Sequence, residues 1–165
     1  MRCLALVVAT TLCASSVAFA RTQNPLALGL EAGVLRIAKD ESILQLGLRA
    51  APSLGGYGSV DFTFATFPDA LAHGVLAFLM DLGLTYGAPR ESSPVYVFPH
   101  AGFSMLSGSD LSSGGGGTIG GLNAGLAVLV HTSPRLGIRA DYTYRRFKGA
   151  DIGTPSITFG LLFMH

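Results

Sequence analysis

The sequence predicts an all-β protein, an eight-stranded antiparallel up-and-down transmembrane β-barrel preceded by a cleaved signal peptide. Three observations lead to this fold class. The first 20 residues have the pattern of a secretory signal. The rest of the chain has no uninterrupted apolar run of the ~18 residues that a spanning helix needs. It has instead eight segments of roughly ten residues in which apolar and polar residues alternate, and a tilted strand needs that length to cross a bilayer.

The N-terminal segment has the three parts of a signal peptide. Arg2 supplies the charged start, residues 4–14 form the apolar stretch, and an Ala-x-Ala cleavage site ends at Ala20. We therefore expect two parts, a signal peptide at 1–20 and a single outer-membrane β-barrel domain at 21–165.

The composition after the signal differs from that of an ordinary water-soluble domain. Charged residues make up 13% of the chain, against about 25% in a typical globular protein, and its 22 glycines are about twice the usual share. Without Arg2 the formal charge falls to zero, and without basic runs nucleic acid is not expected as a partner. Cys3 and Cys13 both lie in the signal, which excludes disulfides and thiolate chemistry from the mature chain.

The expected strands are the segments in which apolar residues recur at every second position. The alternation is weakest in the fifth segment, where Pro99 would remove a ladder hydrogen bond. The sixth and seventh segments form a hairpin across a tight turn at 131–135 that contains Pro134. The eight segments are 26–36, 43–50, 59–66, 73–86, 94–106, 122–130, 136–145 and 156–165.

The region 68–84 could be strand or helix. Leu71, Val75 and Phe78 fit helical spacing, whereas Asp81 and the small residues on its side of the chain fit a strand. Strand is the favoured interpretation.

The connections between segments predict the orientation of the barrel. If the mature N-terminus lies in the periplasm, the longest connection, residues 107–121, is an exposed outer loop and the turn at 131–135 is periplasmic. Long outer loops and short periplasmic turns are typical of outer-membrane barrels. The short connection at 39–42 fits this pattern less well.

The polar face of the strands decides whether the barrel is soluble or spans a membrane. This face is rich in glycine and carries few charges of mixed sign, which is poor coverage for a surface in water. Inside a narrow eight-stranded lumen, the same charges would pair with one another because unpaired charges away from water are expensive. We therefore predict a lumen polar network that supports the fold and leaves no open pore, made of Glu31, Arg49, Asp61, Asp81, Arg139, Asp141 and Arg145.

The glycine-rich hairpin 119–146 and the closing strand 156–165 resemble those of the small eight-stranded outer-membrane proteins of the OmpA/OmpX type. The resemblance implies residence in the bacterial outer membrane, contact with outer-membrane lipid, insertion by the barrel-assembly machinery, and a monomer. The closing strand departs from the family pattern at its end. Family members usually finish on Phe or Trp, whereas this chain has Phe163 followed by Met164 and His165.

The function predicted on these grounds is that of a non-enzymatic integral outer-membrane barrel with a side-chain-filled lumen. Its role would be structural, or one of surface interaction, with a surface ligand bound through the loop 107–121. Three alternatives remain open. They are a soluble periplasmic lipid-binding barrel of the lipocalin kind, an outer-membrane lipid A-modifying enzyme, and a narrow porin-like passage for solutes.

Chemical motifs give no catalytic, cofactor or metal site. The Gly-rich stretch 115–120 matches G-x-G-x-x-G but lacks the strand–helix context of a dinucleotide site. The four histidines are scattered without metal-ligand spacing. His131 and Ser133 resemble the catalytic pair of outer-membrane lipid A deacylases, but Ser133 precedes a proline in a turn, and the nearest downstream acid is Asp141.

Four basic residues lie near the outer ends of the expected strands. Basic side chains at such positions can reach the interface and contact phosphates of the outer leaflet. The predicted outer-leaflet lipid contacts are Arg36, Lys39, Arg146 and Lys148.

Overall fold

A computed structural model describes residues 26–38, 41–54, 58–87, 94–149 and 153–164 of the chain. The predicted signal peptide and its cleavage site lie outside these residues. Eight strands and one short helix make up the described part. In chain order they are β1 (Leu26–Ala38), β2 (Glu41–Pro52), β3 (Gly58–Thr66), α2 (Pro68–Ala72), β4 (Val75–Tyr86), β5 (Val95–Asp110), β6 (Gly116–Ser133), β7 (Leu136–Phe147) and β8 (Gly153–Met164).

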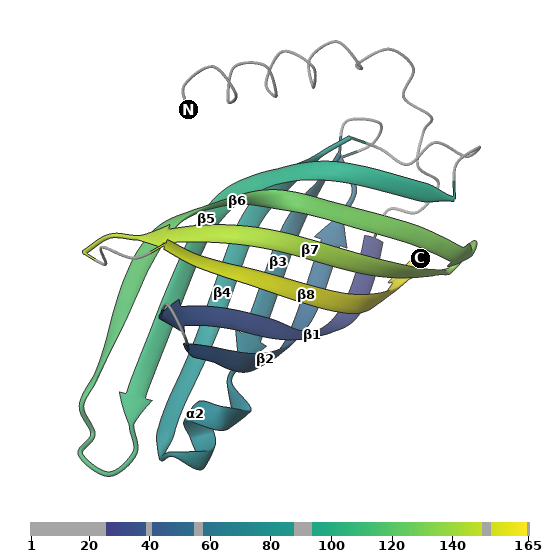
Figure 1. The fold of residues 1–165 in the computed structure, drawn as a ribbon. Helices are drawn as coiled ribbons and strands as arrows, with labels where there is room; N and C mark the ends of the chain where they lie inside the picture. Colours follow the sequence, from purple (N-terminus) through teal and green to yellow (C-terminus); the bar gives the residue numbers. More distant parts are fainter. Residues whose placement is uncertain (1–25, 39–40, 55–57, 88–93, 150–152, 165) are drawn as a thin grey trace.

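The eight strands form a closed antiparallel barrel in which each strand pairs with the next along the chain (Figure 1). The last strand returns to the first, with a β1–β8 register that runs from Ala27↔Met164 to Leu35↔Ser156. Closure pairs the backbone groups of what would otherwise be two sheet edges. The predicted up-and-down barrel is therefore confirmed. Among the described residues, no helix has the length and apolar character needed to cross a membrane.

The ambiguous region is a strand preceded by one helical turn. Leu71 belongs to α2, whereas Val75 and Phe78 belong to β4, so the helical spacing joined residues of two different elements. Pro68 occupies the start of α2, where a proline is tolerated because its missing N–H would have no helical partner. Pro99 lies within β5, one residue beyond Thr85↔His100, the last pair of the β4–β5 register.

The predicted outer loop 107–121 is mostly β-hairpin, so this prediction is wrong in its bounds. The β5–β6 register continues to Ser109↔Gly116, and only five residues, 111–115, form the turn. Backbone N–H and C=O groups pair in a ladder whatever the side chain, so a serine- and glycine-rich stretch can extend two strands that are already in register. The turn at 131–135 is also shorter than expected, because β6 continues to Ser133 and β7 begins at Leu136.

Two ends of the barrel can now be distinguished. The hairpin end carries α2 and the β5–β6 hairpin, which projects past the rim (Figure 1). The Gly74 carbonyl, between α2 and β4, accepts a hydrogen bond from the Leu111 N–H of the hairpin turn at 2.9 Å. The termini end is where β1 begins and β8 ends.

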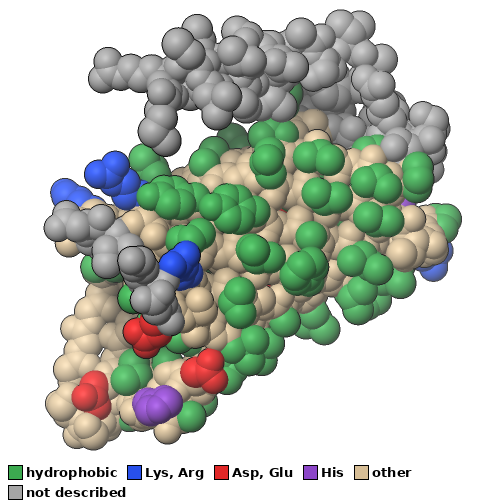
Figure 2. Space-filling view, in the orientation of Figure 1, with side chains coloured by type: hydrophobic (Ala, Val, Ile, Leu, Met, Phe, Trp, Pro, Cys, Tyr) green, Lys and Arg blue, Asp and Glu red, His purple; other side chains and the backbone are tan. Residues whose placement is uncertain are grey.

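The outer wall of the barrel is apolar. Large hydrophobic side chains on every strand point outward and are exposed, among them Leu30, Leu48, Leu84, Leu122 and Phe159. Figure 2 shows them spread over the face in view, with the charged side chains gathered near the ends of the barrel. A soluble lipid-binding barrel needs the reverse arrangement, with charged residues over its surface and apolar residues around the ligand.

Candidate functional site

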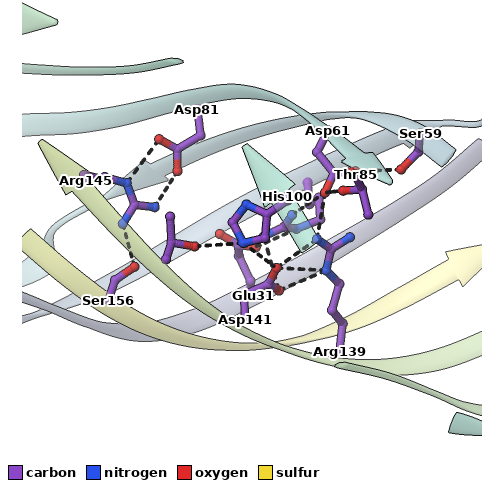
Figure 3. A network of polar contacts seen from close by, with 12 residues as sticks. Glu31, Ser59, Asp61, Asp81, Thr85, His100, Arg139, Asp141, Arg145 and Ser156 are labelled. Carbon is purple, nitrogen blue, oxygen red and sulfur yellow. Dashed lines mark hydrogen bonds and ion pairs between the residues drawn. The ribbon is translucent and has the colours of Figure 1, made fainter. Parts of the chain in front are cut away.

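The lumen of the barrel holds the charged side chains that the sequence analysis singled out. The structure brings all seven together in ion pairs or hydrogen bonds across the lumen, in two clusters (Figure 3). Alternation along each strand explains this. Residues two apart share a face, so the strands that present leucines outward must present these charges inward.

The larger cluster is built around two arginines that share three carboxylates. Asp61 accepts hydrogen bonds from Arg49 Nη1 at 3.0 Å, Arg139 Nη2 at 2.7 Å and the Thr85 hydroxyl at 2.7 Å. Asp141 is held by the fork of Arg139, with contacts of 2.8 to 3.1 Å to its two oxygens. Arg139 thus joins β7 to β3 directly across the barrel.

Arg49 completes this cluster. Its Nε donates to Glu31 Oε2 at 2.9 Å, and its Nη2 lies 2.9 Å from the same oxygen and 3.4 Å from Asp141 Oδ2. With the Asp61 contact included, four strands, β1, β2, β3 and β7, are joined through one guanidinium. Bidentate arginine–carboxylate pairs are strong and geometrically specific, so the cluster fixes the side chains that occupy the middle of the lumen.

The smaller cluster lies nearer the hairpin end. Arg145 makes a forked contact with Asp81 across the lumen and also donates to the Ser156 hydroxyl. The Ser104 hydroxyl donates to Asp81 and accepts from Asn123 Nδ2 at 2.8 Å. This cluster joins β4, β5, β6, β7 and β8.

His100 lies between the two clusters and was missed by the sequence analysis. Its Nε2 is 3.4 Å from the Thr143 hydroxyl and 3.9 Å from Asp141 Oδ1. A Cβ built on Gly125 would lie 2.6 Å from the same nitrogen, so the glycine leaves the room that the imidazole occupies. His100 shares its face of β5 with Ser104, but Pro99 weakens the alternation that could have revealed this.

Two clusters of buried apolar side chains lie in the lumen, one toward each end of the barrel. We call the buried cluster at the hairpin end the hairpin-end plug, and the one at the other end the termini-end plug. The hairpin-end plug is made of Leu35, Ala65, Phe67, Leu79 and Phe147. The termini-end plug is made of Phe98, Ala127, Leu129 and Leu162, with Tyr96 packed against it. Neither plug was predicted.

One buried polar side chain stands apart from both clusters. Gln45 of β2 is 1% exposed, and neither its amide nitrogen nor its oxygen has a hydrogen-bond partner in the described part of the chain. A buried polar group without a partner costs roughly 1–3 kcal/mol.

The two residues considered for catalysis, His131 and Ser133, each contact another residue of the termini end. The Ser133 hydroxyl accepts a hydrogen bond from the Arg135 N–H at 3.3 Å, whereas the His131 ring packs edge-on against Tyr96. Among the described residues, no group of three or more His, Cys, Asp or Glu side chains could hold a metal ion.

The predicted lipid contacts lie at the hairpin end of the outer wall. Arg36, Arg146 and Lys148 are exposed there, and Arg36 Nε also donates to the Ala38 carbonyl at 3.1 Å. Lys39 lies outside the described residues.

The tip of the β5–β6 hairpin is an ordered turn. The Asp110 carboxylate accepts hydrogen bonds from the Ser112 hydroxyl and N–H at 2.7 and 2.8 Å, and from the Ser113 N–H at 3.3 Å. These donors, the Ser112 hydroxyl first among them, lower the pKa of Asp110 to about 2. The turn is therefore capped by an ionised side chain at physiological pH.

Comparison with known proteins agrees with this architecture. The sequence matches no protein-family model and no curated protein. The fold is similar to the N-terminal β-barrel domain of Pseudomonas aeruginosa OprF, with a TM-score of 0.65 and 15% identity over 87% of this chain and 100% of that one. It is also similar to Neisserial surface protein A, with a TM-score of 0.63 and 14% identity over 86% of this chain and 97% of that one. A third similar structure is the attachment invasion locus protein Ail of Yersinia pestis, with a TM-score of 0.52 and 13% identity over 85% of this chain and 96% of that one.

The fold and the lumen together define the class. The chain has the closed eight-stranded architecture of the small outer-membrane β-barrels, with charges inside and apolar side chains outside. The resemblance to this group noted from the sequence is confirmed at the level of the fold.

Proposed function

We propose that this chain is an integral outer-membrane protein whose barrel is closed to solutes and whose role is structural or one of interaction at the cell surface. The observation that carries the proposal is the distribution of side chains. An apolar outer wall surrounds an ion-paired lumen with a buried apolar plug toward each end. A bilayer is the solvent that matches such a wall.

The contents of the lumen argue against solute passage. The two clusters use their charges on one another, so a passing ion would have to displace an arginine–carboxylate pair away from bulk water. It would also have to cross both plugs. Planar-bilayer recording tests this part of the proposal. We expect no conductance steps from the purified barrel, and regular steps would contradict the closed lumen.

The hairpin end is proposed to face outward. It carries the projecting β5–β6 hairpin, whereas β6 and β7 are joined at the termini end by only two residues between Ser133 and Leu136. Long outer and short periplasmic connections are the rule in such barrels. Two of the similar proteins are named for the cell surface or for attachment, which supports a surface role for the hairpin, residues 107–121.

A protease added to intact cells tests the orientation. Cleavage within the turn 111–115, with the rest of the barrel protected, supports an outward hairpin. Protection of the hairpin in intact cells and its cleavage only after the outer membrane is opened would contradict it.

The assembly of the protein is proposed to follow the usual route. The signal 1–20 would be removed, the barrel-assembly machinery would insert the chain, and the barrel would remain a monomer because its first and last strands pair with each other. N-terminal sequencing of the mature protein checks the first step, and a start at Arg21 is the expected result.

The basic side chains of the hairpin end are proposed to contact phosphates of outer-leaflet lipid. Arg36, Arg146 and Lys148 are exposed just beyond the apolar wall, where long basic side chains can reach the interface. Replacing these three residues and Lys39 with Gln is expected to weaken association with anionic lipid in a salt-dependent manner. Unchanged association would remove this part of the proposal.

We propose no catalytic role. The turn position of Ser133 and its contact with Arg135 favour an ordinary turn residue over a nucleophile. The mass of lipid A from expressing cells is expected to be unchanged. A mass change that disappears in the Ser133→Ala variant would contradict this.

A further inference from the structure

The two plugs are similar in composition but are held by different backbones. At the termini end, Phe98 and Ala127 are direct partners in the β5–β6 register, and Leu129 is paired with Arg139 of β7. The side chains of that plug therefore sit within continuous ladders.

At the hairpin end, one seam of the barrel is short. The register between β2 and β3 has five pairs, from Leu46↔Thr66 to Ala50↔Phe62, whereas every other neighbouring pair of strands has nine or more. The next two residues in line, Gln45 and Phe67, are not paired in this ladder.

The helix α2 takes the place of β3 beyond this point. It is joined to β2 by one hydrogen bond, from the Leu44 N–H to Asp69 Oδ2 at 3.0 Å. Phe67 immediately precedes α2 and is 1% exposed in the hairpin-end plug. The plug therefore includes a ring that is attached to the helix and lies outside the strand ladder.

The other end of α2 is a glycine turn, whose carbonyl accepts the hydrogen bond from Leu111 described above. Gly74, between α2 and β4, has φ +77°, and a Cβ built there would meet no atom within 4 Å. A glycine in this left-handed conformation is unstrained, and the surrounding space is open.

Gln45 makes the closed arrangement less stable. Its buried amide has no hydrogen-bond partner in the described part of the chain, and water entering between β2 and α2 would satisfy it. The unpartnered amide therefore lies one residue beyond the last pair of the shortest strand register in the described barrel.

We propose that α2 and Phe67 form a movable gate at the hairpin end, and that the gate opens along the β2–α2 seam to admit water and small polar molecules as far as the Asp81–Arg145 cluster. The termini-end plug stays closed, so the gate gives access to the lumen without passage through it. This inference rests on the closed barrel proposed above.

Cysteine accessibility tests the gate, because the only native cysteines, Cys3 and Cys13, lie in the predicted signal. Leu35→Cys reports on the hairpin-end plug and Leu162→Cys on the termini-end plug; the two leucines are 0% and 4% exposed. The purified barrels in detergent are treated with a small charged methanethiosulfonate. Only variants that keep a band that shifts on boiling are compared. Leu79→Cys and Leu129→Cys serve as a second pair if either reporter fails to fold.

We expect Leu35→Cys to react at least about tenfold faster than Leu162→Cys, because local opening at the seam exposes only the first. Adding Gln45→Met is expected to slow Leu35→Cys by about fivefold or more, since it removes the amide that hydration satisfies. Adding Asp69→Ala is expected to accelerate it.

Equal rates at the two plugs, faster reaction at Leu162→Cys, or no effect of Gln45→Met would overturn the gate. None of these results would imply that the barrel conducts ions. Channel steps in a planar bilayer would instead contradict the closed lumen, so the two proposals fail in different ways.

Discussion

The middle of the lumen and its two ends are filled in opposite ways. In the middle, arginines and carboxylates from five strands satisfy one another, as Arg139 does with Asp61 and Asp141. At each end, buried clusters that include phenylalanine and leucine side chains occupy the lumen.

The difference shows how a narrow barrel can have both a defined strand register and a lumen that excludes water. Forked ion pairs hold particular strands at a particular register, because each partner leaves a buried charge behind if the other is displaced. Apolar side chains exclude water but specify register only loosely. The middle therefore determines which barrel forms, and the ends determine what can enter it.

The largest expected loss of stability comes from removing one partner of the ion pairs in the middle of the lumen. Asp141→Ala leaves Arg139 and Arg49 each short of a carboxylate in the lumen, and we expect the unfolding free energy to fall by about 3–5 kcal/mol. Urea titration of the barrel in lipid vesicles measures this. The double variant Arg139→Met/Asp141→Leu is expected to recover much of the loss. A single variant as stable as the parent would show that the pair contributes nothing.

Truncating a side chain of the hairpin-end plug is expected to lower the unfolding free energy slightly less. Leu79→Ala opens a cavity in the hairpin-end plug and should lower the unfolding free energy by about 2–4 kcal/mol. Leu82→Ala on the same strand is the matched control. Leu82 is 55% exposed on the outer wall, so lipid can fill the space and the loss is expected to be smaller. An equal loss at both positions would contradict the plug.

One substitution is expected to stabilise the protein. Gln45→Met replaces the amide without a partner by an apolar side chain of similar size, and we expect the unfolding free energy to rise by about 1 kcal/mol. The same urea titration checks it. A loss of stability would mean that the amide is satisfied in the folded barrel.

The smallest expected effect lies outside the lumen. Asp110→Ala removes the acceptor of the hairpin turn and should speed amide exchange at Ser112 while leaving barrel unfolding unchanged. Because the pKa of Asp110 is lowered to about 2, its contribution is present above the ordinary value of 3.8 and is lost as the pH falls through about 2. The protection of the Ser112 amide, relative to an unstructured chain at the same pH, should persist from pH 8 to pH 4. Loss of this protection at pH 5 would contradict the cap.

The sequence was sufficient to predict the barrel and the charged middle because a bilayer leaves few choices. Glu31, Asp61 and Arg139 alternate with large apolar residues, so a strand that presents leucines to lipid has to turn these charges inward. The same rule does not predict that Leu35 and Phe67 point inward, because an apolar side chain is equally compatible with the lipid-facing wall.

The remaining misses have separate physical causes. The sequence predicts a loop at 107–121 because glycine is depleted in strands, whereas the strand pair that precedes this stretch fixes its ladder. His100 was hidden by the neighbouring Pro99. The short β2–β3 seam depends on where β3 ends, and side-chain alternation has no information about that point.

The most direct test of the central claim, an apolar wall in a bilayer around a closed lumen, is fractionation of expressing cells. The membranes are washed with urea, and unheated and boiled samples are compared on SDS gels. The account predicts recovery in the washed outer membrane with a band that shifts on boiling, as expected for a closed, detergent-resistant barrel. Release into the soluble periplasm without a shift would contradict it.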